Sequence, residues 1–201
     1  MVLPALKMDK KALQNSSMLH KPLVFLDIET TGMGPAQSRI TEIGALRVEN
    51  NEVVATYNQL INPEQPIPSF ITNMTGFSND MVWEQPNFKG LASDLELFLS
   101  DAIFVAHNVS FDYGFIRAEF ARIGNTFSMD RMCSARLSRK LYPEHRSHRL
   151  DKIIERMDIE VLNRHRALDD AEIIWKFYQA ELSRLGQDLF KHMDTLLVRS
   201  R

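Results

Sequence analysis

The sequence predicts one α/β domain built on a mixed sheet, with antiparallel strands first and parallel strands after them. Three strand-like apolar runs follow one another at 22–29, 40–48 and 53–61, and no helical pattern separates them. Further along, helical spacing of apolar residues alternates with one short buried run at 102–106. This succession indicates a sheet with helices on its faces, and 201 residues are enough to bury its core.

The first three strands are supported by the residues at their ends. Lys21-Pro22 precedes the apolar run Leu23–Leu26, which is typical of a buried strand. Between the second and third strands, the segment Glu49–Glu52 contains two asparagines and suits a hairpin turn. Prolines at 63, 66 and 68 then indicate a loop.

The helices are predicted from apolar spacing and from polar residues at their starts. Short helical pieces are expected at 69–73 and 78–82, and Asn87 is expected to cap a helix that runs through Leu99. Further helices are expected at 110–123, 132–141, 149–157 and from about 166 to 185. The last apolar residues predict an amphipathic helix by their spacing: Leu189, Phe190, Met193, Leu196 and Leu197.

We therefore expect three parts in the chain: an N-terminal extension at 1–20, the folded domain at 21–185, and an amphipathic tail at 186–201 packed on or near that domain. The apolar stretch at 1–6 is too short for a secretory signal. No run approaches the roughly 20 apolar residues that a membrane helix needs, so no membrane association is expected.

Charge and cysteine content limit the classes of function. The formal net charge is −2, so no overall basic field marks a nucleic-acid binder. The single cysteine, Cys133, excludes an internal disulfide and indicates a reducing compartment, which makes a cytoplasmic location the expectation. The cations are unevenly distributed, and seven of them lie in one region with few acids: Arg131, Arg136, Arg139, Lys140, Arg146, Arg149 and Lys152. This region could contact phosphates, and a solvated helix face is an equally good interpretation.

A pair of acids ends the first predicted strand, in the segment DIETTG at 27–32. Side chains alternate along a strand, so Asp27 and Glu29 point to one face and Ile28 to the other. Two carboxylates about 6–7 Å apart repel each other, and a hard divalent cation such as Mg²⁺ would relieve this. On the pair alone, a solvated strand end before a turn is an equally good account.

Two further acidic motifs stand at predicted helix starts. HNVSFD at 107–112 places Asp112 in the first turn of one helix, and HRALDDA at 165–171 places Asp170 in the first turn of another. Taken alone, each acid is explained by its favourable interaction with the helix dipole. His165 alone is explained as a surface histidine.

Together the three motifs, DIETTG, HNVSFD and HRALDDA, resemble those of the DEDD exonuclease superfamily in its histidine-bearing DEDDh branch. The resemblance covers roughly 22–183, and three motifs in the right order make it specific. This branch includes the proofreading epsilon subunits of bacterial DNA polymerase III and RNase T. The resemblance implies an RNase H-like fold, two divalent ions (Mg²⁺ or Mn²⁺), and 3′→5′ release of nucleoside 5′-monophosphates.

The resemblance also implies a role for each matching residue. His165 would act as general base. Four carboxylates would hold the ions: Asp27, Glu29, Asp112 and Asp170. This agrees with the chemistry, because two ions stabilise the charge on the attacking and leaving oxygens, and a histidine near neutral pKa can accept a proton. Substrate contacts are implied for four more residues: Thr30, Met74, Thr75 and Phe111. For Phe111, packing in the core is an equally good interpretation.

Helix geometry distinguishes Asp170 from its neighbour Asp169. With 100° per residue, the buried side of the last long helix is marked by Ala171, Ile174 and Tyr178. Asp170 falls at the edge of that side and Asp169 points towards water. The spacing of five from His165, which the family shares, selects the same residue.

The substrate is predicted less sharply than the chemistry. Nucleic acid with a free 3′ end is expected, single-stranded DNA is favoured, and RNA 3′-end trimming is the alternative. Thr75 stands where polymerase-associated members often have histidine, and a replicase role would need a separate polymerase partner. A non-catalytic binding subunit on the same fold is a third interpretation, which would predict a lost ligand, and none is lost.

Overall fold

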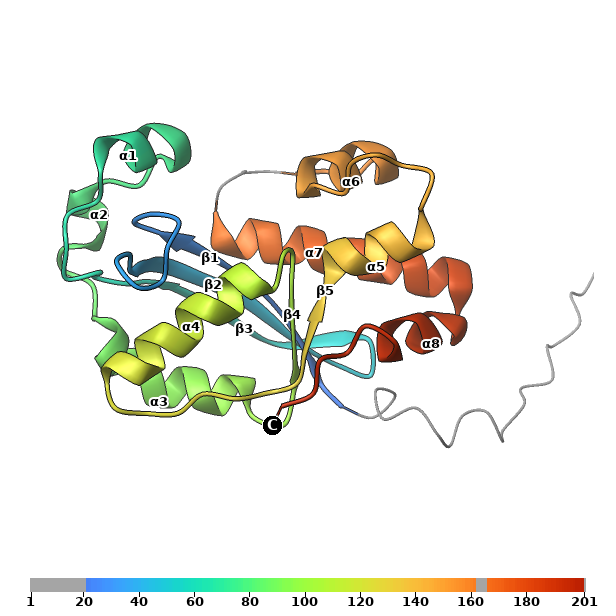
Figure 1. The fold of residues 1–201 in the computed structure, drawn as a ribbon, viewed down its shortest axis with the longest axis horizontal. Coiled ribbons are helices and arrows are strands. Elements are labelled where there is room, and N and C mark those ends of the chain that lie inside the picture. The colour runs from blue at the N-terminus through green and yellow to red at the C-terminus, as the bar shows by residue number, and fades with distance from the viewer. Residues whose placement is uncertain (1–20, 162–165, 201) are drawn as a thin grey trace, which may run out of the picture.

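The computed structural model describes residues 21–161 and 166–200, and it confirms the predicted mixed sheet (Figure 1). Five strands lie in the order β3, β2, β1, β4, β5, with the bounds β1 Leu23–Thr30, β2 Ile40–Glu49, β3 Glu52–Leu60, β4 Ile103–Ala106 and β5 Arg131–Cys133. The pairs β1–β2 and β2–β3 are antiparallel, whereas β1–β4 and β4–β5 are parallel. The expected extension at 1–20 lies outside the described residues.

Helices cover both faces of the sheet and divide its core in two (Figure 1). On one face, α3 (Phe88–Leu99) and α4 (Ser110–Arg122) pack against Val24, Leu26 and Ile28. On the other face, the core around Leu23 and Phe25 includes residues of four helices: α5 Ser134–Leu141, α6 Leu150–Met157, α7 Ala167–Leu185 and α8 Asp188–Asp194. This division follows from the alternation of side chains along β1.

A smaller projection lies between β3 and α3. It consists of α1 (Ser69–Thr75) and α2 (Asn79–Val82), and it has its own small apolar core of Ile67, Ile71, Phe77 and Val82. Gly76 ends α1 with φ of 79°, a left-handed conformation that glycine adopts without strain.

Two local predictions are confirmed in detail. Asn50 and Asn51 form the β2–β3 turn with φ of 52° and 65°, and asparagine tolerates this left-handed conformation better than most residues. The Asn87 side chain accepts a 3.1 Å hydrogen bond from the backbone N–H of Gly90 and so caps α3.

The prediction of one helix over 132–141 is wrong at its start. Arg131–Cys133 form the strand β5, with Met132 opposite Val105 of β4, and α5 begins only at Ser134. A three-residue strand is too short to display the period of two by which strands are recognised. The tertiary pairing with β4 therefore decides its conformation.

The C-terminal residues pack on the domain. Leu189 and Met193 of α8 are completely buried in the core that α7 shares. Beyond α8, Val198 pairs with Arg131, and the backbone N–H of Ser200 donates to Asp130. Among the described helices, none combines the length and the apolar character that crossing a membrane requires.

Candidate active site

The alternation predicted for β1 places two acids next to α7. Leu23 and Phe25 lie in the core beneath α7, and Asp27 and Glu29 continue the same row beyond them. Ile28, between the two acids, points into the core on the opposite face. Both carboxylates are only partly exposed at the end of the strand.

The start of α7 lies directly on β2, which brings Asp170 to the same place. Gly44 pairs with Asp27, and a Cβ on Gly44 would lie 2.0 Å from the backbone N of Leu168, so only glycine fits there. Oxygen atoms of Asp27, Glu29 and Asp170 all lie within 4.8 Å of one another. Asp169 is not part of this group and is more exposed than Asp170, as the helix geometry predicts.

Asp112 reaches the same region from the other side of the sheet. It lies in the first turn of α4, is almost completely buried, and accepts a hydrogen bond from the backbone N–H of Ile28. Burial raises the pKa of the Asp112 carboxyl to about 8, although this bond and one from its own N–H oppose the shift. Asp112 is thus bonded to the backbone of β1 between Asp27 and Glu29. It is not part of the group in which the oxygens of these two acids and Asp170 lie within 4.8 Å of one another.

These donors fit a hard divalent cation. Three carboxylate oxygens lie close enough to share one ion, and carboxylate oxygens are the ligands that such an ion prefers. Among the residues that the structure describes, no sulfur or nitrogen ligand joins this group, which favours Mg²⁺ or Mn²⁺ over softer metals. Asp27, Glu29 and Asp170 would hold such an ion, with Asp112 beside them.

Glu42 and Arg166 support the site, and the sequence prediction missed both. Glu42 of β2 is completely buried opposite Glu29. Its carboxylate accepts hydrogen bonds from Arg166 Nη2 at 2.7 Å and from the Ala167 backbone N–H at 2.9 Å. These bonds fix the first residues of α7. The available signal was a carboxylate between apolar residues of a predicted strand, where a buried charge requires a partner.

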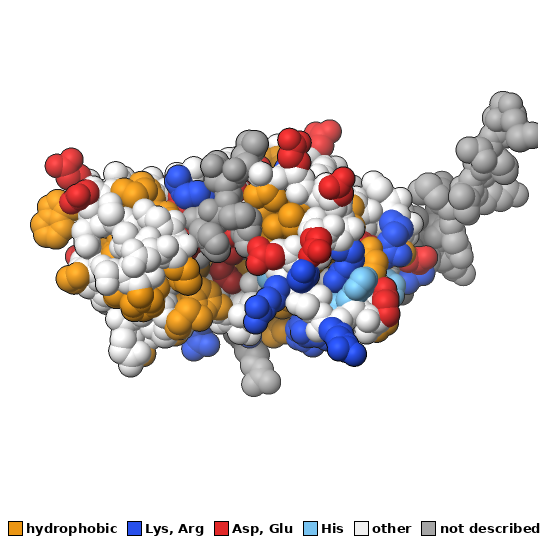
Figure 2. Space-filling model, turned by 90° about the horizontal axis from the view of Figure 1, so that it is seen from above, with side chains coloured by type: hydrophobic (Ala, Val, Ile, Leu, Met, Phe, Trp, Pro, Cys, Tyr) orange, Lys and Arg blue, Asp and Glu red, His pale blue; other side chains and the backbone are white. Residues whose placement is uncertain are grey.

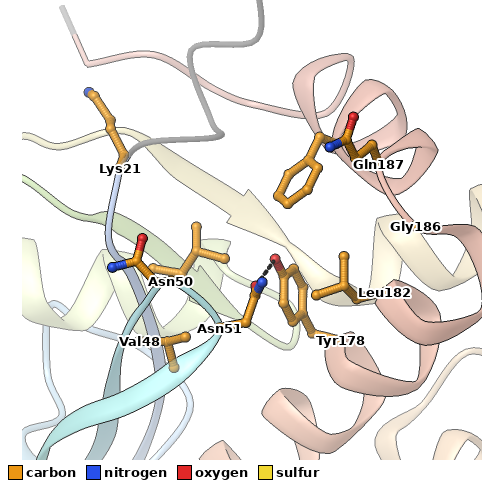
Figure 3. A pocket seen from close by; sticks show the side chains of 10 residues that line it. Lys21, Val48, Asn50, Asn51, Tyr178, Leu182, Gly186 and Gln187 are labelled. Carbon is orange, nitrogen blue, oxygen red and sulfur yellow. Dashed lines mark hydrogen bonds between the residues drawn. The ribbon is translucent and has the colours of Figure 1, made fainter. Parts of the chain in front are cut away.

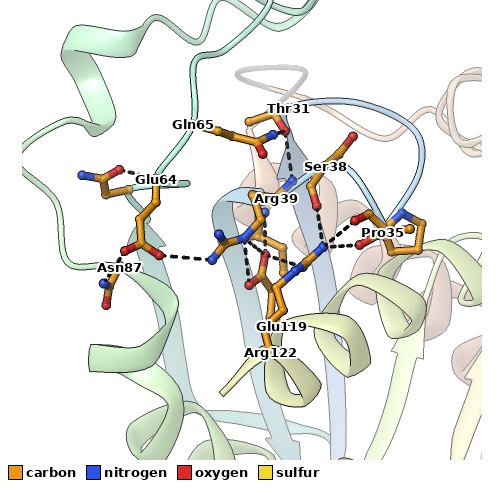
Figure 4. A network of polar contacts seen from close by, with 12 residues as sticks. Thr31, Pro35, Ser38, Arg39, Glu64, Gln65, Asn87, Glu119 and Arg122 are labelled. Atoms are coloured by element: carbon orange, nitrogen blue, oxygen red, sulfur yellow. Dashed lines mark hydrogen bonds and ion pairs between the residues drawn. The ribbon is translucent and has the colours of Figure 1, made fainter. Parts of the chain in front are cut away.

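A second polar network holds the turn that follows β1 (Figure 4). Arg39 Nε contacts the buried Glu119 of α4 at 2.8 Å, and Arg122 pairs with the same carboxylate at 3.1 Å. Arg122 also donates to backbone oxygens of the loop, including that of Pro35. The Arg39 backbone N–H donates to Thr31 Oγ1 at 2.9 Å, which closes the turn next to the acids.

The residues predicted to contact substrate have mixed surroundings. Thr30 Oγ1 donates to the Gly32 oxygen within the turn, and Thr75 Oγ1 donates to the Ile71 oxygen within α1. Met74 is 57% exposed, whereas the Phe111 ring packs 4.9 Å from that of Phe115. His165, predicted as the general base, lies outside the described residues.

A cavity of about 400 Å³ lies at the opposite end of β1 from the acids (Figure 3). Apolar side chains such as Leu23, Val48 and Leu182 line it, and the Tyr178 hydroxyl donates to Asn51 Oδ1 at 3.4 Å across one side. No carboxylate is among its lining residues, so this cavity lacks the donors of the acidic site.

The profile of the exonuclease family matches residues 24–178. The chain belongs to this family. A PolC-type DNA polymerase III from Halalkalibacterium halodurans is 32% identical over 172 residues, or 83% of this chain. The 3′-5′ exonuclease DinG from Bacillus subtilis is 33% identical over 166 residues, or 82% of this chain. The chain spans only 12% of the polymerase and 18% of DinG.

Solved structures of exonucleases share the fold. Exonuclease X in complex with 5′ overhanging duplex DNA gives a TM-score of 0.69 at 22% identity, covering 86% of this chain and 98% of that one. The nuclease domain of 3′hExo, a DEDDh family member bound to rAMP, gives 0.71 at 16% identity, covering 83% and 94%. These structures confirm the predicted RNase H-like fold, and the family profile confirms that the chain is an exonuclease.

Proposed function

We propose that this exonuclease uses two divalent ions to remove nucleoside 5′-monophosphates from the 3′ end of single-stranded DNA. The observation that carries the proposal is the convergence of Asp27, Glu29 and Asp170 within 4.8 Å, with Asp112 bonded to the backbone between the first two. These four acids come from three separate segments of the chain, and their oxygens are the donors that hard divalent ions take.

In this mechanism the protein supplies ligands, orientation and a proton acceptor. The ions, when bound, lower the pKa of an attacking water and stabilise charge on the leaving oxygen. Asp27, Glu29, Asp112 and Asp170 would hold them. His165, two residues before the first residue of α7, would accept the proton of that water. Thr30, Met74, Thr75 and Phe111 would contact the terminal nucleotides.

The substrate and partner are part of the same proposal. Relatives of the PolC type are DNA polymerases, which supports DNA as substrate and a polymerase as partner. RNA 3′ ends are the second candidate, because a structural neighbour binds rAMP. A cytoplasmic location is proposed from the one cysteine, Cys133, which is free and buried.

The experiment offers the purified chain 3′-labelled and 5′-labelled DNA and RNA oligomers with Mg²⁺, Mn²⁺ or EDTA. We expect stepwise loss from the 3′ end, release of 5′-monophosphates, resistance of an oligomer with a 3′-terminal phosphate, and no reaction in EDTA. Faster RNA than DNA digestion would support the second candidate. Full activity in excess EDTA would contradict the metal mechanism.

A further inference from the structure

We propose that five exposed cations on α5 and the segment leading into α6 bind the phosphodiester backbone of the strand whose 3′ end is hydrolysed. The inference rests on the proposed function, since it names where that substrate lies. We call these residues the basic surface: Arg136, Arg139, Lys140, Arg146 and Arg149. All five are exposed, and none forms an ion pair with another described residue.

The basic surface differs from the group of cations in the sequence. Arg131 does not belong to it, because its guanidinium lies 4.3 Å from the Tyr113 ring centroid beside α4. Lys152 is already paired with Glu155. Elsewhere, Arg39, Arg166 and Arg184 are likewise paired with carboxylates. Unpaired cations are the ones free to exchange small counterions for phosphates.

Helix geometry presents three of the cations together. Arg136, Arg139 and Lys140 have the spacing i, i+3, i+4, which places their side chains on one face of α5. Leu137 and Ser138 are buried on the opposite side of the helix. The exposed face therefore carries three positive charges within two turns.

Hydrogen bonds around His148 and Arg156 hold the segment of the remaining two cations, Arg146 and Arg149, beside α5. His148 Nε2 donates to the His145 oxygen at 3.0 Å, and His148 Nδ1 lies 2.9 Å from Ser138 Oγ. Arg156 donates to Ser138 Oγ at 3.2 Å and to the Ser147 oxygen at 3.1 Å. A hollow of about 320 Å³ adjoins this corner, with lining residues that include His145, Arg146, Lys152 and Arg156.

The basic surface starts next to the acidic site. Ser134, the first residue of α5, has its Oγ 2.9 Å from His107 Nδ1, in the motif that ends with Asp112. Figure 2 shows Lys and Arg side chains gathered on the right of the face that also carries α1 and α6. A strand leaving the acidic site along α5 would meet these cations.

The part of the molecule that contains α1 and α2 has a different chemistry, which indicates the orientation of the nucleic-acid strand. Residues 48–88 contain no Lys or Arg, and Phe70, Met74 and Trp83 expose their side chains there. Apolar and aromatic side chains suit bases, whereas cations suit phosphates. We therefore assign the terminal bases to the side of α1 and the upstream phosphates to α5.

The test measures binding of fluorescein-labelled dT20 to the full chain in EDTA, by anisotropy, between about 50 and 200 mM salt. The variant Arg136→Gln/Arg139→Gln is compared with Lys89→Gln/Arg117→Gln, which neutralises exposed cations of α3 and α4. Two lost phosphate contacts should reduce the slope of log K against log salt by about 1.4, with the control unchanged. If melting shows the first variant to be destabilised, Lys140→Gln/Arg146→Gln repeats the comparison.

Equal slopes for the variant and the control would overturn the basic surface. So would tighter binding of a labelled poly-glutamate peptide than of dT20, since the partner would then be an acidic protein. The proposed function is judged separately, by hydrolysis of dT20 in Mg²⁺. If the parent chain has no nuclease activity but the slopes differ, the basic surface is supported and the proposed function is contradicted. If hydrolysis is normal and the slopes are equal, the proposed function is supported and the basic surface is contradicted.

Discussion

The two adjacent acids at the start of α7 test the site at the scale of single residues. Asp170 lies with Asp27 and Glu29, whereas Asp169 is more exposed and outside their group. Asp170→Asn should reduce turnover to near background in a metal-titrated single-turnover assay, because it removes a charge from the metal ligands. Asp169→Asn is the matched control and should keep most activity. The opposite ranking would show that the ligand set is wrong.

His165→Ala should lower kcat on the order of 10²–10⁴-fold, the range for loss of a general base. The reason is its position five residues before Asp170, in the motif shared with the DEDDh branch. His192→Ala, at a histidine of α8, is the control. A kcat within about threefold of the parent would mean that another group accepts the proton.

Single residues also show what the sequence could reveal. Asp27, Glu29, Asp112 and Asp170 carry local signals, namely strand alternation, helix starts and motif spacing. Glu42 shows only that a buried carboxylate needs a partner, and its role depends on a contact with Arg166, 124 positions away. Likewise, the requirement for glycine at position 44 comes from the close approach of α7 and not from any turn of its own.

At the scale of elements, β2 positions α7 through Glu42. Glu42→Gln keeps the shape of the side chain and removes the charge that holds Arg166 and the Ala167 N–H. We expect Mn²⁺ affinity, measured by calorimetry without substrate, to fall about 10–100-fold, the usual cost of losing a group that orients metal ligands. Glu49→Gln removes a carboxylate at the other end of the same strand, where it pairs with Arg47, and should leave the affinity unchanged. Unaltered affinity in Glu42→Gln would limit Glu42 to a role in folding.

The corner between α5 and α6 should make stability depend on pH. Burial, together with the nearby Arg156, Arg139 and His145, lowers the pKa of His148 below its ordinary value near 6.5. The unfolded chain then binds more protons than the folded one between the two pKa values, so stability falls as pH drops below about 6.5. Urea unfolding at several pH values should show this slope in the parent and a smaller one in His148→Gln. His145→Gln keeps the backbone oxygen that binds His148, and the slope should persist there.

The elements themselves were largely predictable, since long periodic segments specify their own type. The helices α3, α4 and α7 begin and end within a few residues of the predicted bounds. The strand β5 could not be found because three residues next to a helix show no period, and only the parallel neighbour β4 makes them extended.

At the scale of the whole molecule, the fold holds three segments together at the end of β1. The sheet order places β1 at the centre, with Asp112 approaching from the α4 face and Asp170 from the α7 face. The sequence predicted that these acids would converge, but not that Asp112 would be more deeply buried than the other three. Burial is a property of the assembled layers, so it has no signature within the motif.

An ion held by these carboxylates should stabilise the folded chain, which gives a test without substrate. A ligand bound only by the folded state at about 100 times its Kd stabilises by about 2.7 kcal/mol. For a chain of this size that corresponds to a rise in Tm of roughly 5–10 °C. Scanning calorimetry with Mn²⁺ and with EDTA measures it.

Asp170→Asn provides the decisive comparison in that experiment. The Tm of the metal-free variant is the reference for its own change with Mn²⁺. Its rise in Tm with Mn²⁺ should be smaller, since the ion loses a charged ligand. Asp169→Asn should behave as the parent does in both conditions. An equal rise in Tm for Asp170→Asn and the parent would mean that the ion binds elsewhere, and that the gathered acids do not form the metal site.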